Sequence, residues 1–369
     1  MDIITISEGI RMFRRSLHVR KKGFKRYSGN DEEICKKVIE DCWNKKNGYF
    51  QASAGHFCLF YSRDFSWCVK PLISLGHKDR VIKTLEYALD IFSKYKKVRV
   101  AINPKGKPFD FPYLAIDSLP SMIKSLRISE AFGLVKKHKN FLEKDALKLF
   151  DRVIDTKTGL VRKDRYFSSI KDYEKRKSSC YDNTMIAMLS QDLDFFNLRN
   201  PFSRYEYKEI IKKNFWTGSY FLNDLSGDRY ITGDSNVFPY WSGIFSDRSM
   251  MQRSIKAIAS KKLDKPFPLK YNQFGEEHKM VFLEFFVKDY ENDNIWPHIG
   301  LLFVEVMSEI SKSDAKNYLL HYKKNIEKYG TFLEVYDSFG EIYHSPFYFS
   351  DEAMLWSVIY LYLKKKIGI

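Results

Sequence analysis

The sequence predicts an all-α protein in which six helical hairpins close into an (α/α)6 toroid, with short β-hairpins in the loops of one face. The first observation is an apolar helix start that recurs roughly every 55 to 60 residues, which is the scale of a repeated supersecondary unit. The inner helices are expected to start near Asp64, Asp117, Asp182, Val237, Ile295 and Asp351.

The second observation is a set of lysine-rich amphipathic helices that alternate with the apolar ones. These outer helices are expected at residues 31–46, 78–95, 139–153, 204–214, 247–261 and 313–328. Helices that are covered by an outer helix and by one another can be apolar all round. An open helical solenoid has similar alternation but a more regular repeat than this chain. We therefore expect a toroid over residues 31–369 and a basic N-terminal arm over residues 1–30.

Local signals mark several helix ends. The first outer helix has Asn30 or Asp31 as its N-cap, and Asn47 with Gly48 marks its stop. Three later stops carry a glycine in a comparable turn: Gly159, Gly218 and Gly330. Each glycine can adopt the left-handed conformation that ends a helix, and the residues that follow suit a short strand or hairpin.

Composition limits the class of protein. The 369 residues carry a net charge of +16, but lysine is spread over nearly all the expected outer helices, which favours a solvated surface over nucleic-acid binding. No apolar run approaches the ~20 residues of a membrane span, and the N-terminus lacks a signal-peptide pattern. The five cysteines form no CxxC pair, and the histidines have no metal-ligand spacing. We expect a cytoplasmic monomer or homodimer that binds an oligosaccharide substrate, with no metal, cofactor, nucleic acid or membrane as partner.

The loops that precede the inner helices carry aromatic and acidic side chains. Arg63 and Asp64 stand at the mouth of an apolar helix, which indicates a pocket because an unpaired charge is costly to bury; the alternative for Asp64 is a helix N-cap. Aromatic faces cover the apolar side of a sugar ring, and carboxylates bind its hydroxyls. A single tryptophan is more often a core residue, but four of the six lie at or just inside inner-helix starts: Trp67, Trp241, Trp296 and Trp356.

Six short motifs, in their order and spacing, resemble those of the six-hairpin glycosidases, namely the glucoamylases, trehalases and amylo-α-1,6-glucosidases. The motifs are SRDFSW at residues 62–67, IDSL at 116–119, SSCYDN at 178–183, WP at 296–297, EVYD at 334–337 and WS at 356–357. The resemblance implies an inverting glycoside hydrolase that acts on α-linked gluco-oligosaccharides with a carboxylic acid and a carboxylate base. Most glucoamylases and debranching enzymes have a β-sandwich domain where this chain has about 30 residues, so the length of the substrate stays open.

The resemblance also implies roles for particular residues. Glu334 is the expected base and Asp172 the expected acid, with Glu174 and Asp164 as alternative acids on the same loop. The residues implied in substrate binding are Arg63, Asp64, Trp67, Asp117, Arg176, Asp182, Asn183, Asp234, Tyr240, Trp241, Trp296, His298, Tyr336 and Trp356. For Arg176, Asp182 and Asn183 the alternative is that they hold the loop of the acid. The alternatives are another carbohydrate activity on the same toroid (phosphorylase, epimerase or uronide hydrolase) and a non-catalytic protein that binds carbohydrate or nucleic acid.

Overall fold

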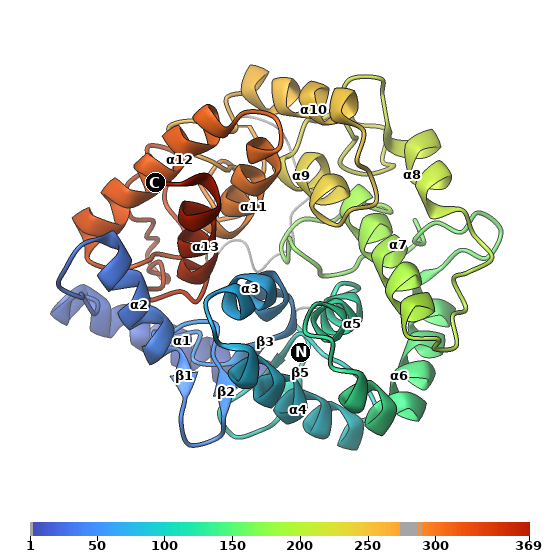
Figure 1. Cartoon of the computed structure of the whole chain (residues 1–369), viewed down its shortest axis with the longest axis horizontal. Coiled ribbons are helices and arrows are strands. Elements are labelled where there is room, and N and C mark those ends of the chain that lie inside the picture. Colours follow the sequence, from blue (N-terminus) through green and yellow to red (C-terminus); the bar gives the residue numbers. More distant parts are fainter. Residues whose placement is uncertain (1–2, 112, 274–286, 288–289) are drawn as a thin grey trace.

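The computed structural model describes residues 3–111, 113–273, 287 and 290–369. Helices dominate this part of the chain and form two concentric rings (Figure 1). The predicted all-α toroid is therefore confirmed, and the expected short hairpins are present as small antiparallel sheets and isolated bridges.

The inner ring is made of apolar helices, each packed against the next. It consists of α3 (Ser62–Ser74), α5 (Ser118–Ile128), α7 (Cys180–Phe195), α9 (Gly233–Trp241), α11 (Pro297–Ser308) and α13 (Ser357–Ile367). Successive helices of this series are in contact, and α13 packs back onto α3, so the ring closes. Closure is the feature that separates a toroid from an open solenoid.

The outer ring is made of amphipathic helices that bury one face against the inner ring. It consists of α2 (Asp31–Asp41), α4 (Lys78–Lys94), α6 (Phe132–Val153), α8 (Tyr207–Phe215), α10 (Arg248–Ser260) and α12 (Lys312–Tyr329). In α4, for example, Val81, Leu85, Ala88 and Phe92 are fully buried at helical spacing. All six lie where the lysine-rich pattern predicts an outer helix.

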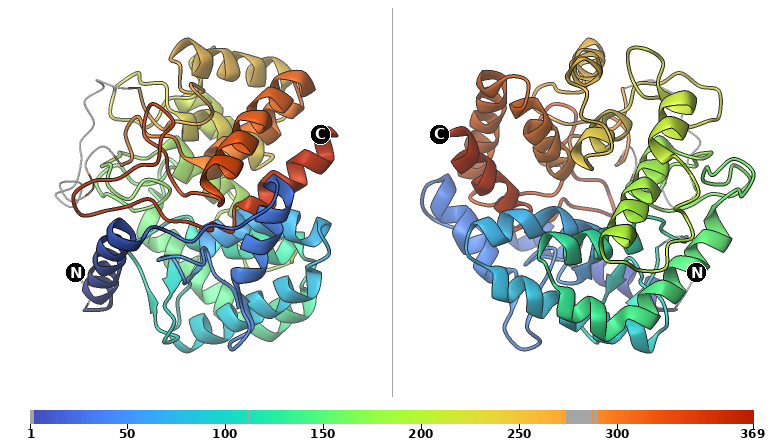
Figure 2. Two further views of the ribbon diagram at one scale, coloured as in Figure 1. Left: turned by 90° about the vertical axis from the view of Figure 1, so that its left-hand side faces the viewer. Right: turned by 45° about the vertical axis from the view of Figure 1, so that its right-hand side comes forward.

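The N-terminal segment is a helix, α1 (Ile3–Lys22), that lies outside the two rings. It is on the opposite side of the molecule from the C-terminus (Figure 2). The Arg15 guanidinium pairs with the buried Glu352, and the Arg20 guanidinium donates to the backbone carbonyls of Ser345 and Tyr348. These contacts hold α1 against the loop that precedes α13.

Two small sheets shape the loops. Strands β1 (Trp43–Asn44) and β2 (Tyr49–Phe50) form a hairpin, and β3 (Phe60–Tyr61), β4 (Ala101–Ile102) and β5 (Pro108–Phe109) form an antiparallel sheet in that order. Strand β3 runs directly into α3 and so fixes the start of that helix.

Several predicted ends need correction. The first outer helix stops at Asp41, not near residue 46, because Trp43 and Asn44 pair with the next strand; its N-cap is Asn30, which forms a capping box with Glu33. The predicted left-handed glycines are confirmed, with φ of 76° at Gly159, 95° at Gly218 and 62° at Gly330.

Two inner helices start elsewhere than predicted. Helix α9 starts at Gly233, not Val237, and a Cβ at this glycine would lie 2.4 Å from the Lys270 carbonyl oxygen, so the close approach requires glycine. Helix α13 starts at Ser357, not Asp351, because the backbone of Asp351 is paired with Glu334. In the described residues, no helix has the length and apolar character that crossing a lipid bilayer requires.

Candidate active site

A cavity of about 550 Å³ opens on the face where several inner helices begin. Its more polar part is lined by residues from the starts of α3, α11 and α13 and from the loops before α7, α11 and α13: Arg63, Asp64, Trp67, Asp172, Tyr271, Tyr290, Glu291, Trp296, His298, Glu334, Tyr348 and Trp356. Because inner helices start here, free backbone amides and polar loop side chains gather at this end of the ring.

Arg63, in the first turn of α3, is the cation at which several carboxylates meet. Its guanidinium lies 3.2 Å from Asp117 and 3.9 Å from both Asp64 and Asp172, and it donates to the backbone carbonyl of Ser169. Burial raises the pKa of Asp64 to about 6, and the charge of Arg63 opposes this rise. The Arg63 and Asp64 pair therefore presents a charged, hydrogen-bonding surface to the cavity, as the sequence predicts.

Aromatic rings surround this charged pair. The rings of Trp67 and His298 stack with centroids 4.7 Å apart and planes 3° apart, and Trp356 lies 4.6 Å from the same imidazole. The Nε2 atom of His298 is 2.9 Å from the Tyr271 hydroxyl. Burial lowers the pKa of His298 well below its ordinary value, so the imidazole is neutral and can exchange hydrogen bonds with a neutral ligand.

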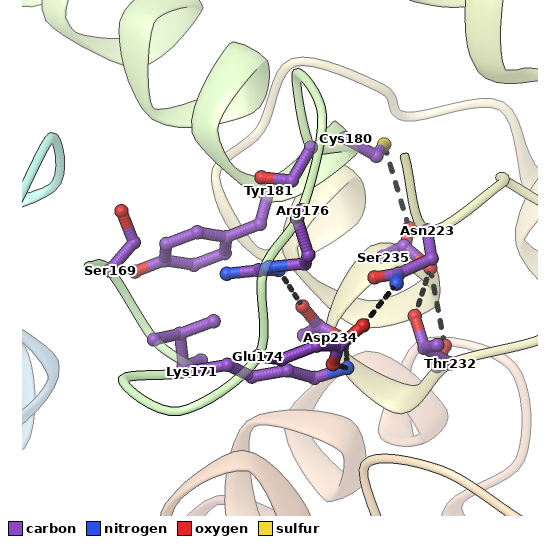
Figure 3. A network of polar contacts seen from close by, with 12 residues as sticks. Ser169, Lys171, Glu174, Arg176, Cys180, Tyr181, Asn223, Thr232, Asp234 and Ser235 are labelled. Atoms are coloured by element: carbon purple, nitrogen blue, oxygen red, sulfur yellow. Dashed lines mark hydrogen bonds and ion pairs between the residues drawn. The ribbon is translucent and has the colours of Figure 1, made fainter. Parts of the chain in front are cut away.

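The loop that carries Asp172 is held by a buried ionic network (Figure 3). The fully buried Lys171 places its Nζ atom 2.7 Å from Glu174 and 3.6 Å from Asp234. Arg176 pairs with the other oxygen of Asp234 at 2.8 Å. Lys171 and Arg176, which flank Asp172 in the sequence, thus neutralise the carboxylates of Glu174 and Asp234. These pairs hold the loop, and the Asp172 carboxyl faces the cavity.

A further carboxylate, Glu291, fixes the backbone of this loop. One of its oxygens accepts from the amide of Asp172 at 2.6 Å, and the other accepts from the amide of Tyr173 at 2.8 Å. Burial raises the pKa of Asp172, and the charge of Arg63 opposes that rise. Burial also raises the pKa of Glu291, and the charge of Asp172 adds to it; since this repulsion is mutual, the pair favours keeping one proton.

Glu334 has a different environment, made of neutral donors. The hydroxyl of Tyr290 donates to its Oε1 atom, and Oε2 accepts from the Tyr348 hydroxyl at 2.6 Å and from the Asp351 amide at 3.0 Å. Burial raises the pKa of Glu334 to about 8 and Asp351 raises it further, whereas these donors lower it. Hydrogen bonds to both oxygens favour the ionised carboxylate, which is the form that a general base needs.

A second layer orients these donors. The Tyr348 hydroxyl also lies 2.9 Å from His56 Nε2, and burial lowers the pKa of His56 to about 4, so this histidine is neutral. The carboxylate of Asp351 accepts from the amides of His56 and Phe57 at 2.8 and 2.9 Å. The backbone amide of Glu334 also donates to the carbonyl of Asp351, so Asp351 joins the loop of His56 and Phe57 to the segment that carries Glu334.

Other predicted site residues lie outside the cavity and have structural partners. Asp164 is exposed and pairs with Arg162, so neither it nor the network member Glu174 faces the cavity beside Asp172. The predicted sugar ligands that the cavity lining does not include are Asp117, Arg176, Asp182, Asn183, Asp234, Tyr240, Trp241 and Tyr336.

Each of these residues has a local reason for its place. Asp182 accepts from Ser179 at the start of α7, and Asn183 binds the amide of Val161. Tyr240 and Trp241 are in the last turn of α9, far along the helix from its start, because α9 begins four residues before the predicted Val237. Tyr336 is buried against Phe267.

Glu291, Tyr290 and Tyr348 are not among the site residues that the sequence predicts. Glu291 is in the loop just before α11, where site residues are expected, but it lies outside the aromatic motif at Trp296 that marks this loop. The tyrosines carry no spacing signal. Within residues 3–111, 113–273, 287 and 290–369, no cluster of three or more His, Cys, Asp or Glu side chains has the arrangement of a metal site.

No protein-family model and no curated protein matches this sequence. Solved structures do match. A rhamnosidase from Klebsiella oxytoca with rhamnose bound has a TM-score of 0.65 at 11% identity, over 92% of this chain and 64% of that chain. A bacterial glucoamylase complexed with acarbose has a TM-score of 0.60 at 11% identity, over 91% of this chain and 55% of that chain.

A third match is a GH63 mannosylglycerate hydrolase from Thermus thermophilus in complex with Tris, with a TM-score of 0.58 at 10% identity. It is matched over its whole length and over 90% of this chain, whereas this chain spans about two thirds or less of the rhamnosidase and the glucoamylase. At such identities the likeness concerns architecture. The chain has the (α/α)6 toroid fold of the six-hairpin glycosidases.

Proposed function

We propose that the protein is an inverting glycoside hydrolase that cleaves α-linked glycosides, α-glucosides first among them. One observation carries the proposal: Asp172 and Glu334 line the same cavity with opposite hydrogen-bond environments. Glu334 receives three donors, whereas no hydrogen-bond donor among the described residues reaches the Asp172 carboxyl, whose nearest cationic contact is Arg63 at 3.9 Å.

The mechanism follows from that difference. Glu334 removes a proton from a water molecule as its oxygen attacks the anomeric carbon, while Asp172 gives its proton to the glycosidic oxygen and the bond to the leaving group breaks. Attack from the face opposite the leaving group inverts the anomeric configuration. Arg63 and Asp64 bind the hydroxyls of the sugar in the more polar part of the cavity, and the rings around His298 cover its apolar side.

Glu291 acts as a positioning residue in this scheme. Glu291 accepts hydrogen bonds from the amides of Asp172 and Tyr173 and so fixes the backbone from which the Asp172 side chain extends. Its negative charge favours the protonated form of Asp172. The network behind the loop, from Lys171 to Asp234, serves the same end through charge pairing.

The choice of sugar is the finer part of the proposal. The matched structures are named for rhamnose, mannosylglycerate and glucoamylase chemistry, and those names belong to those proteins. The test therefore offers 4-nitrophenyl α-D-glucoside, α-L-rhamnoside and α-D-mannoside side by side with maltose.

Proton NMR of the first product formed decides the mechanism. We expect hydrolysis of at least one of these glycosides, with the opposite anomer of the free sugar appearing before mutarotation. Release of the same anomer would overturn the inverting assignment. No hydrolysis of any glycoside by the pure protein would overturn the proposed function.

A further inference from the structure

The outer half of the cavity differs in character from its more polar part. Helix α1 provides much of its rim through Ile6, Ile10 and Phe13, which recur at helical spacing and are 46%, 49% and 38% exposed. Across from them, Phe347 is 42% exposed and its ring lies 6.0 Å from that of Phe13. Large apolar side chains with this exposure, beside an opening, mark a surface that binds something apolar.

The wall between this rim and the carboxylates is also apolar. Its described residues include Met12, Phe57, Val100, Phe109 and Phe111. Glu8 is the charged side chain that this wall contributes among the described residues, and it is buried and paired with Arg11 at 2.7 Å. A second sugar ring here would bring several hydroxyls and leave them without partners, which costs free energy for each one. An apolar group would lose nothing.

The position of the acid shows which part of a substrate would meet this wall. The Asp172 side chain is 24% exposed, whereas Glu334 is 1% exposed. The acid therefore lies toward the opening and the base lies at the closed end. Since the acid gives its proton to the leaving oxygen, the leaving group extends toward the rim formed by α1.

We propose that the substrate is a single sugar joined to an apolar leaving group, an alkyl chain or an aromatic ring system, which binds between α1 and the phenylalanine wall. The proposal rests on the proposed glycosidase function and names the part of the substrate that the sugar site leaves open. It assigns to α1 the role of a specificity element, since Ile6, Ile10 and Phe13 contact the leaving group.

The test compares glycosides whose leaving groups are all alkoxides of similar basicity, so that differences report binding and not chemistry. The methyl, glyceryl, octyl and 2-phenylethyl α-glycosides of glucose, rhamnose and mannose serve as substrates. Two buried methylenes contribute about tenfold to binding, so we expect kcat/KM for octyl to exceed that for methyl by about 100-fold if four of the added methylenes are covered. The octyl and 2-phenylethyl arms distinguish a preference for chains from one for rings.

Two variants localise the effect. Ile10→Ser should lower kcat/KM for the octyl glycoside by about tenfold, equivalent to losing contact with about two methylenes, and leave that for the methyl glycoside unchanged. Leu17→Ser is the matched control, because Leu17 continues the same helical stripe and is 42% exposed but does not line the cavity. Both sites are exposed, so neither change threatens folding.

The outcomes separate the two proposals. If the protein cleaves the 4-nitrophenyl glycoside of a sugar but prefers the glyceryl glycoside, or maltose, to the octyl glycoside, the apolar leaving group is overturned and the proposed hydrolase function stands. An equal loss in Ile10→Ser and Leu17→Ser would overturn the role of α1. If no glycoside is cleaved, the hydrolase fails, and calorimetric binding still tests the apolar wall: octyl glycosides must bind more tightly than methyl ones, and Ile10→Ser must remove that difference.

Discussion

The two walls of the cavity that carry Asp172 and Glu334 are built on different principles. The Asp172 wall is charged: Lys171, Glu174, Arg176 and Asp234 form its buried support, and the acid itself lacks a donor among the described residues. The Glu334 wall is neutral, and tyrosine hydroxyls and a backbone amide donate directly to the carboxylate. Burial raises the pKa of both carboxyls, so depth alone assigns no roles. The different placement of donors supports the proposed roles of acid and base.

The largest expected effect comes from the neutral wall. Glu334→Gln removes the base and keeps the shape, so kcat should fall by about 100- to 10,000-fold while the sugar still binds. Hydrolysis rates measure the loss of kcat, and calorimetric binding of the released sugar measures whether the sugar site is intact. A rate close to that of the wild type would show that another group activates water.

The charged wall is expected to matter most for stability. Lys171→Met removes the cation that pairs with the buried Glu174 and leaves Asp234 with Arg176, and breaking a buried pair costs about 3–5 kcal/mol. Denaturant unfolding measures the loss. The matched control is Lys137→Met on the surface, where pairs with Glu86 and Asp90 contribute about 0–1 kcal/mol. Equal losses in the two variants would contradict the distinction between buried and exposed pairs.

Tyr348→Phe sharpens the comparison through pH. The active form needs Glu334 ionised and Asp172 protonated, and because the pKa of Glu334, about 8, lies above that of Asp172, the Glu334 pKa sets the alkaline limb of kcat/KM. The Tyr348 hydroxyl lowers the Glu334 pKa, so its removal should move the alkaline limb upward by about one pH unit and lower the maximal kcat/KM. A limb that stays in place would mean that Tyr348 does not stabilise the ionised base.

Glu291→Gln is expected to act on the opposite limb. The acid must be protonated, and its pKa, which burial raises, is the lower of the two and sets the acidic limb. Removing the neighbouring negative charge lowers that pKa, and the acidic limb should move to lower pH. The kcat/KM profile measures both limbs, and an unchanged acidic limb would reduce Glu291 to a purely structural role.

The smallest effect is expected at Asp164, an alternative acid on the same loop. It is exposed and pairs with Arg162, so Asp164→Asn should leave kcat/KM within about twofold of the wild type, as is usual for surface changes. A loss as large as that in Asp172→Asn would mean that the loop changes shape in the working enzyme.

The sequence predicts the ring of helices but only part of the candidate active site. Apolar and lysine-rich helices alternate strongly enough to predict the toroid, and Arg63, Asp64 and Trp67 are found at the cavity because they stand beside a helix start that β3 fixes. Local patterns do not report where a helix is forced to begin by packing. The contact of Gly233 with Lys270 starts α9 early and takes Trp241 away from the site.

Site residues whose partners are far away in the sequence are harder still to predict. Glu291 meets Asp172 across 119 positions of sequence, and Tyr290 meets Glu334 across 44. Such pairs depend on closing the ring, which no window of sequence contains. Conversely, the family resemblance implied sugar binding for Arg176 and Asp234, whereas these two side chains pair with each other and do not line the cavity.

The most direct test of the division between acid and base is a leaving-group series. Initial rates are measured for aryl and alkyl α-glycosides of one sugar, over leaving groups of widely different pKa, in Asp172→Asn and Glu334→Gln. We predict that Asp172→Asn loses most activity on alkyl leaving groups, which need a proton, and retains far more on 4-nitrophenyl, whereas Glu334→Gln loses activity on all of them alike. The reverse pattern would contradict the account and make the neutral wall the source of the acid.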